Sequence, residues 1–130
     1  MTHLRGKKPP ISRDSNALAK APAPPKHLST YARAEWKRIM PGLLERGIIT
    51  RGDLGGVEDY CRARGLAREL EAKVRDEDGN IDPKMTRLQD KAMQTARQLA
   101  AEYGLSPVSR VRVGSAATDD DESDNPLMVR

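Results

Sequence analysis

The sequence predicts an all-α protein, a helical hairpin followed by a long third helix and a short fourth helix. In the middle of the chain, apolar residues recur at the three- and four-residue spacing of a helix face, and alternating, strand-like runs are nearly absent. Residues that favour helix caps stand at the ends of these stretches. Of the 130 residues, 37% are hydrophobic and none is Phe, so the chain has too few large apolar side chains for a large core.

Charge and proline content divide the chain into three parts. Residues 1–28 hold six Lys or Arg, one Asp and five of the nine prolines, which predicts a disordered basic arm over residues 1–27. Residues 114–130 hold five acidic residues and one Arg, which predicts a disordered acidic tail. The helical core is therefore expected over residues 28–113, a length at which a single core is marginal.

The first helix is expected to begin at Ser29 or Thr30, because both residue types accept hydrogen bonds from the free N–H groups of a helix start. Gly47 suits the left-handed conformation that ends a helix. Pro41 lies inside this stretch and predicts a kink or a break. The apolar residues of the helix share one face: Ala32, Trp36, Ile39 or Met40, and Leu43.

The second helix is expected to open at Thr50, with Asp53 three residues later as a short variant of the capping box. Glycine costs about 1 kcal/mol relative to Ala in a helix interior, which disfavours a rigid helix here. The glycines concerned are Gly52, Gly55, Gly56 and Gly65. The polar run over residues 75–80 predicts the following turn. The buried side is expected to comprise Leu54, Val57, Tyr60, Cys61, Ala67, Leu70 and Val74.

The third helix has a cap residue at each end. Asp82 suits the N-cap and Pro83 the first helical position. Gly104 suits the left-handed residue after the last turn, on which Leu105 can fold back as in a Schellman motif. A second Ser-Pro start signal predicts a short fourth helix over residues 106–113.

A narrow apolar stripe follows the third helix, like one side of a coiled coil. It consists of Met85, Leu88, Ala92, Ala96, Leu99 and Tyr103. The stripe packs either onto the first two helices or against neighbouring copies of the chain, and the shortage of large apolar groups gives the second alternative at least equal weight. The term "seam" is used below for the residues expected in core or oligomer contacts: Trp36, Leu88, Ala92, Ala96, Leu99 and Tyr103.

Catalytic and metal-binding patterns are scarce, so we expect no enzyme activity, cofactor or metal. His3 and His27 have no carboxylate at helical spacing, and Cys61 on an apolar face is expected to be a buried small side chain. No phosphate-binding glycine loop is present, and the acidic run over residues 119–122 lacks calcium-loop spacing. One cysteine excludes an internal disulfide framework. Neither a membrane helix nor a signal peptide is predicted, which favours a small, soluble, intracellular protein.

Basic side chains are the remaining source of function. Arg110 and Arg112 follow the start of the predicted fourth helix, where two guanidinium groups can bind phosphates. The arm residues Arg5, Lys7, Lys8 and Arg13 suit a flexible electrostatic contact with nucleic acid. An exposed arginine pair and a solubilising arm are the alternatives. The basic residues of the second and third helices alternate with acids and are interpreted mainly as solvated faces: Arg62, Arg64, Arg68, Lys84, Arg87, Lys91 and Arg97.

Several of these segments together resemble the small subunits of phage terminases, which package DNA in tailed phages. The resemblance covers about residues 28–113, and its most specific part is the Gly-Leu-Ser-Pro-x-Ser-Arg-x-Arg pattern over residues 104–112. Its other parts are Glu35–Ile39 with Pro41 and Leu43, Gly47 with Thr50 and Asp53, Tyr60–Cys61, the stripe of the third helix and Ala101–Tyr103. The glycine-rich start of the second helix departs from the family pattern.

The resemblance implies a non-catalytic protein that forms homo-oligomeric rings in the host cytoplasm during phage assembly. Such a subunit binds double-stranded viral DNA and delivers it to a terminase large subunit, which carries the ATPase and nuclease. Two other classes stay open on the residues alone. A small dimeric DNA-binding transcriptional regulator would need a helix-turn-helix, but the helix after the 48–53 connector begins with glycines rather than base-reading residues. An assembly scaffold would have no nucleic-acid role.

Overall fold

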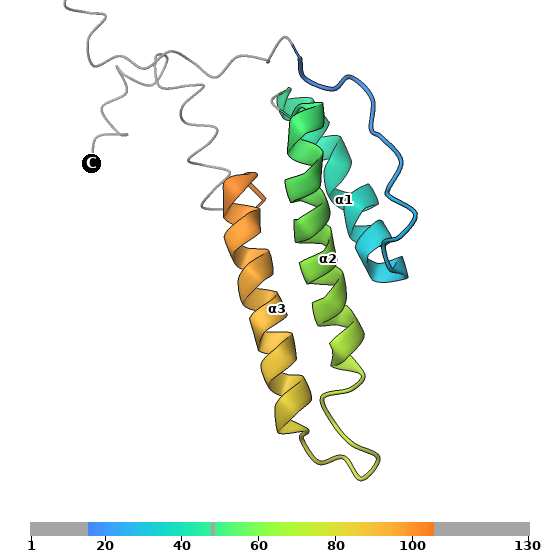
Figure 1. Cartoon of the computed structure of the whole chain (residues 1–130), viewed down its shortest axis with the longest axis vertical. Helices are drawn as coiled ribbons and strands as arrows, with labels where there is room; N and C mark the ends of the chain where they lie inside the picture. The colour runs from blue at the N-terminus through green and yellow to red at the C-terminus, as the bar shows by residue number, and fades with distance from the viewer. Residues whose placement is uncertain (1–15, 48, 106–130) are drawn as a thin grey trace, which may run out of the picture.

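The computed structural model describes residues 16–47 and 49–105, and over these residues the chain is helical, without a strand beyond isolated bridges. The helices are α1 (Thr30–Arg46), α2 (Leu54–Glu71) and α3 (Pro83–Glu102), with a single 3-10 turn at Arg51–Asp53. Figure 1 shows α2 between the other two, antiparallel to each. The all-α prediction is confirmed for this part of the chain. The predicted fourth helix and acidic tail lie outside the described residues.

The ends of α1 follow the predicted caps. Ser29 Oγ accepts a hydrogen bond from the Ala32 N–H at 3.2 Å, and Gly47 adopts φ 69° at the C-cap. The helix continues through Pro41, so the predicted alternative of a break is wrong. Packing explains this result, because the neighbouring Met40 and Leu43 are buried and hold the turn in place although proline removes one backbone donor.

The predicted capping box of Thr50 and Asp53 is present, but it caps the 3-10 turn at Arg51–Asp53, and α2 begins at Leu54 rather than at Thr50. The Asp53 carboxylate accepts hydrogen bonds from Thr50 N at 2.9 Å and from Thr50 Oγ1 at 3.1 Å. The 3-10 turn that contains Asp53 leads directly into Leu54, the first residue of α2. A local sequence signal therefore fixed the direction in which the chain enters α2.

Both ends of α3 agree with the sequence. The Asp82 carboxylate accepts from two backbone N–H groups of the first turn at 3.0 and 3.1 Å, with Pro83 at the first helical position. At the other end Gly104 has φ 67°, and the Leu105 N–H donates to the Ala100 carbonyl at 2.9 Å. This is the predicted Schellman arrangement.

Two glycines of α2 stand where another group approaches the helix. A Cβ on Gly65 would lie 2.7 Å from the Ala32 backbone N of α1. A Cβ on Gly56 would overlap the hydroxyl of Tyr103, whereas one on Gly55 would meet nothing within 4 Å. The expectation that these glycines weaken the helix is therefore incomplete, since two of them allow close packing that Ala would obstruct.

The seam residues differ in burial. Trp36, Ala92 and Ala96 are buried, Leu99 and Tyr103 are half-buried, and Leu88 is 44% exposed. The buried core lies mainly between α1 and α2, and α3 contributes only alanines to the buried residues of the described chain. The stripe of α3 is thus partly core and partly open surface.

The second half of the predicted arm differs from the expectation of disorder. Residues 16–27 are described and pass beside α1 (Figure 1). The Leu18 N–H donates to the Ile49 carbonyl at 2.9 Å, and Trp36 Nε1 donates to the Pro22 carbonyl at 2.9 Å. An extended proline-rich backbone keeps its carbonyls free, and a buried indole N–H needs such an acceptor.

Candidate nucleic-acid interface

The residues predicted to contact DNA lie outside the described part of the chain, so their role stays a prediction. They are Arg5, Lys7, Lys8, Arg13, Arg110 and Arg112. The structure does place the other basic side chains, those of the three helices. Three of these surround one hollow, described below.

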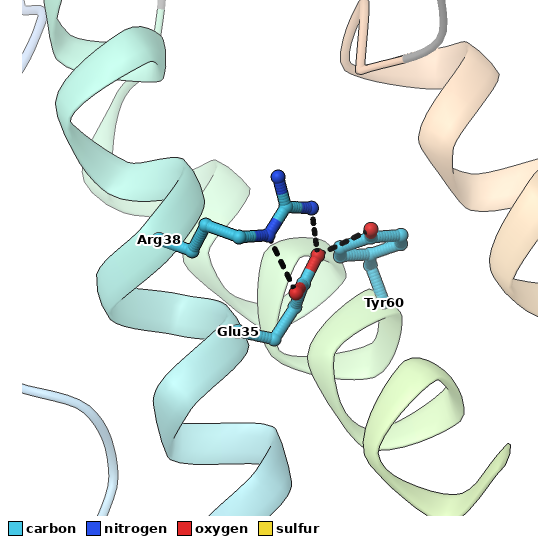
Figure 2. A network of polar contacts seen from close by, with 3 residues as sticks. All are labelled: Glu35, Arg38 and Tyr60. Carbon is cyan, nitrogen blue, oxygen red and sulfur yellow. Dashed lines mark hydrogen bonds and ion pairs between the residues drawn. The ribbon is translucent and has the colours of Figure 1, made fainter. Parts of the chain in front are cut away.

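A buried carboxylate joins α1 to α2. Glu35 is 9% exposed, and its carboxylate accepts from Arg38 Nε at 2.9 Å and from Arg38 Nη2 at 2.5 Å. Tyr60 of α2 donates its hydroxyl to the same carboxylate at 2.5 Å (Figure 2). The i, i+3 spacing puts Arg38 one turn above Glu35, and the forked guanidinium fits both carboxylate oxygens.

The contacts fix the charge of this group. Burial acts to raise the pKa of Glu35, but the hydrogen bonds from Arg38 and Tyr60 and the charges of Arg38 and Arg64 outweigh it, so the pKa is lowered. Burial and the hydrogen bond to Glu35 raise the pKa of Tyr60. At neutral pH the Glu35 carboxylate is therefore anionic and the Tyr60 hydroxyl is protonated.

A hollow of about 490 Å³ opens beside this group, and we call it the arginine hollow. Its lining residues are Arg38, Tyr60, Arg64, Arg97, Ala100 and Leu105. Each helix provides one arginine: Arg38 from α1, Arg64 from α2 and Arg97 from α3. Among the residues that the structure describes, no acidic residue lines it.

The arginine hollow adds a feature that the sequence did not indicate. Arg64 and Arg97 were interpreted with the mainly solvated helix faces, and the structure also brings them to one place with Arg38. Within residues 16–47 and 49–105, Arg38 has the Glu35 carboxylate, and neither Arg64 nor Arg97 has a carboxylate within ion-pair distance. Three guanidinium groups therefore stand against one carboxylate, which leaves excess positive charge at the hollow.

Comparison with known protein families decides the identity. A family model for the small subunit of phage terminases matches residues 32–120, more than half of the chain. The chain belongs to the phage terminase small-subunit family. No curated protein and no solved structure matches it. The matched range covers α2, α3, α1 from Ala32 onward and the arginine hollow, and it extends over Arg110 and Arg112. The family places this terminase small subunit in phage DNA packaging.

The other chemistry-bearing side chains of this terminase small subunit are placed as follows. Cys61 is fully buried, and burial raises the pKa of its thiol to about 12, which confirms the interpretation as a buried small side chain. His27 Nε2 lies 2.5 Å from Glu58 Oε2, a pairing across 31 residues that sequence spacing did not indicate. In the described residues no group of three or more His, Cys, Asp or Glu is arranged to hold a metal ion. No helix there is long and apolar enough to cross a membrane.

Proposed function

We propose that this terminase small subunit is a non-catalytic, ring-forming protein that recognises DNA and acts as an adaptor. It binds double-stranded viral DNA and hands it to the terminase large subunit for packaging, in the host cytoplasm during phage assembly. The observation that carries the proposal is the meeting of three arginines from three helices at one hollow, in a chain of this family. Excess positive charge at a fixed place suits a polyanionic partner.

DNA contact is shared between this fixed site and the flanking basic residues. Arg110 and Arg112 and the arm residues Arg5, Lys7, Lys8 and Arg13 supply further phosphate contacts. Such contacts release counterions, so affinity falls steeply as salt rises. Each subunit then binds weakly, and repetition around a ring raises the affinity through effective concentration.

Oligomer contacts are assigned to the open part of the seam. Leu88 is 44% exposed, and Leu99 and Tyr103 are half-buried along the same helix. Trp36 of α1 and Ala92 and Ala96 of α3 are buried within the chain, so they belong to its own core. Leu88 is the exposed large apolar side chain of this stripe, and a second copy of the chain would cover it.

The absolute mass in solution tests the ring. Light scattering on a sizing column, at low and moderate salt, is expected to give one species many times 14.4 kDa. A monomer would contradict the ring. A dimer that binds a palindromic site would favour the transcriptional regulator instead.

Titration of a fluorescent duplex at several salt concentrations tests DNA recognition. Arg110→Ala combined with Arg112→Ala, and separately deletion of residues 1–15, are each expected to weaken binding in moderate salt. The deletion stops before residues 16–27, because these pack beside α1. Unchanged affinity in both variants would contradict the assignment of these residues, and absence of salt-dependent binding in the wild type would favour a scaffold.

A further inference from the structure

We propose that the arginine hollow binds one backbone phosphate of double-stranded DNA, held between Arg38, Arg64 and Arg97. The proposal rests on the DNA-binding function above and names the site and the chemical group it takes. The hollow is a fixed site on the helices, separate from the flanking segments to which the sequence alone assigned the DNA contacts.

The charge balance of the hollow calls for an anion. The Glu35 carboxylate is already engaged by Arg38 and by Tyr60 on both of its oxygens. Arg64 and Arg97 add two further positive charges without a carboxylate partner among the described residues. Like charges held around one space repel each other, and a bound phosphate converts that repulsion into attraction.

The geometry of the three guanidinium groups suits the oxygens of a phosphate. Arg38 uses Nε and Nη2 for Glu35, so its guanidinium is held at a fixed angle while Nη1 points away from the carboxylate (Figure 2). A preoriented guanidinium loses little freedom when it binds an oxyanion. The fork geometry of Arg64 and Arg97 from the other two helices suits further phosphate oxygens.

The walls of the hollow do not suit a base. Tyr60 is 3% exposed, so its ring face is covered and offers no stacking surface. Ala100 and Leu105 also line the hollow with apolar side chains, and among the described residues no amide or acidic side chain lines it to read a base edge. Contacts of this kind position the DNA backbone without reading sequence. Leu105 also leads directly into the 106–112 segment with its predicted phosphate contacts.

The test compares two double variants of equal charge in the full-length protein. Arg64→Gln with Arg97→Gln removes two positive charges at the hollow. Arg87→Gln with Lys91→Gln is the matched control, which removes two positive charges from α3 outside the hollow. With a fluorescent duplex in moderate salt, the first pair is expected to lose at least about tenfold in affinity, and its salt dependence should flatten by roughly one in slope, as for one phosphate. The second pair should lose less than about threefold. Arg64→Lys with Arg97→Lys keeps the charge without the fork and should fall between them.

The outcomes separate this inference from the proposed function. Equal losses of DNA affinity in the two Gln pairs, or wild-type affinity in the Arg64→Gln, Arg97→Gln protein, would overturn the assignment of the hollow as a phosphate site. The proposed DNA recognition would stand in either case. Absence of DNA binding in the wild type would overturn the proposed function itself. Circular dichroism and mass check that each variant folds and assembles. If the Gln pair at the hollow does not fold, the Lys pair decides, and wild-type affinity and salt slope in it would overturn the hollow.

Inorganic phosphate distinguishes DNA from a free ion. Phosphate is expected to compete with the duplex more strongly for the wild type than for the Arg64→Gln, Arg97→Gln protein, at matched ionic strength. Thermal stabilisation of the wild type by phosphate that is lost in the Gln pair, with equal DNA affinity in both proteins, would indicate a free-phosphate site and would overturn the proposal.

Discussion

The α1–α2 and α2–α3 interfaces differ in the size of the side chains that they bury. Between α1 and α2, large side chains are sealed from solvent and the backbones come close at Gly65. Between α2 and α3, the buried residues of α3 are all alanines, and Leu88 remains 44% exposed. The first interface contains the largest side chains of the described residues that are less than 2% exposed: Met40, Leu43, Val57 and Cys61.

The difference indicates that the two interfaces do different work. The α1–α2 pair buries its large apolar groups within one chain, so it needs no partner. Small alanines let α3 lie close to α2 but bury little apolar area per residue, Leu99 and Tyr103 are only half-buried against the core, and Leu88 is exposed. The exposed Leu88 is the part of α3 at which the proposed neighbouring copy would bind.

The largest expected effect comes from emptying the first interface. Leu43 is fully buried, so Leu43→Ala is expected to cost about 2–5 kcal/mol through lost transfer energy and a cavity. Leu88→Ala on the exposed side of α3 is expected to cost below about 1 kcal/mol in the dilute, dissociated chain. Urea unfolding at low protein concentration measures both. Equal losses would show that α3 is as well packed as α1, against the comparison.

Glycine substitution sharpens the same comparison at the level of the backbone. Gly65→Ala is expected to destabilise by about 1–3 kcal/mol, because its Cβ would meet the Ala32 backbone at 2.7 Å and α1 must shift. Gly55→Ala is the matched control, with nothing within 4 Å of its Cβ, and should stabilise by up to about 1 kcal/mol. Thermal or urea unfolding gives both signs, and a stabilising Gly65→Ala would refute the close approach.

These glycines show where sequence reasoning stopped. The caps at Ser29, Asp82 and Gly104 were predicted correctly, because a cap is a contact within one turn of its own helix. The role of Gly65 depends on Ala32 of α1, which lies more than thirty residues earlier in the chain. Spacing along one helix carries no information about which residue of another helix will lie opposite.

The candidate site was hidden for the same reason. Arg38, Arg64 and Arg97 stand on three different helices, so no spacing along one helix indicates that they meet. The order of the helices and the antiparallel turns decide which faces meet. Helical periodicity likewise did not predict that Leu88 of the seam is exposed, because periodicity identifies an apolar stripe but not the element that covers it.

The polar link across each interface gives a smaller, pH-dependent contrast. Glu35→Gln removes the carboxylate that joins α1 to Tyr60 and is expected to cost roughly 1 kcal/mol at pH 7. Because the folded pKa of Glu35 is lowered, its contribution is present above the unfolded pKa and is lost as pH falls through the folded pKa. The wild-type advantage in urea unfolding should therefore shrink below about pH 4.

The matched link on the other side is Gln89 of α3, which donates to the Ala67 carbonyl at 3.0 Å and to Glu71 at 2.8 Å. Gln89→Ala is expected to cost less than Glu35→Gln, because one of its two hydrogen bonds is exposed, the other is only part-buried, and neither joins two opposite charges. The stability lost in Gln89→Ala should not shrink below about pH 4 in the way predicted for Glu35→Gln. A larger loss for Gln89→Ala would place the stronger polar link between α2 and α3.

The last prediction uses the wild-type protein and measures how often the α1–α2 interface opens. Cys61 is the one cysteine of the chain, it is fully buried, and burial raises the pKa of its thiol to about 12. It precedes Gly65 by four residues and therefore shares the face that meets α1. Reaction with a disulfide reagent at pH 8 should be many times slower in the native protein than in urea, because only opened molecules expose the thiolate.

The Leu43→Ala and Leu88→Ala variants then separate the two interfaces by rate. Leu43→Ala weakens the packing that covers Cys61 and should speed the reaction in proportion to its loss of stability. Leu88→Ala acts on the exposed side of α3 and should leave the rate within about twofold of the wild type. Fast labelling of the native wild type would mean that α1 and α2 do not form the closed pair, and α3 would then have to be the element that holds the chain together.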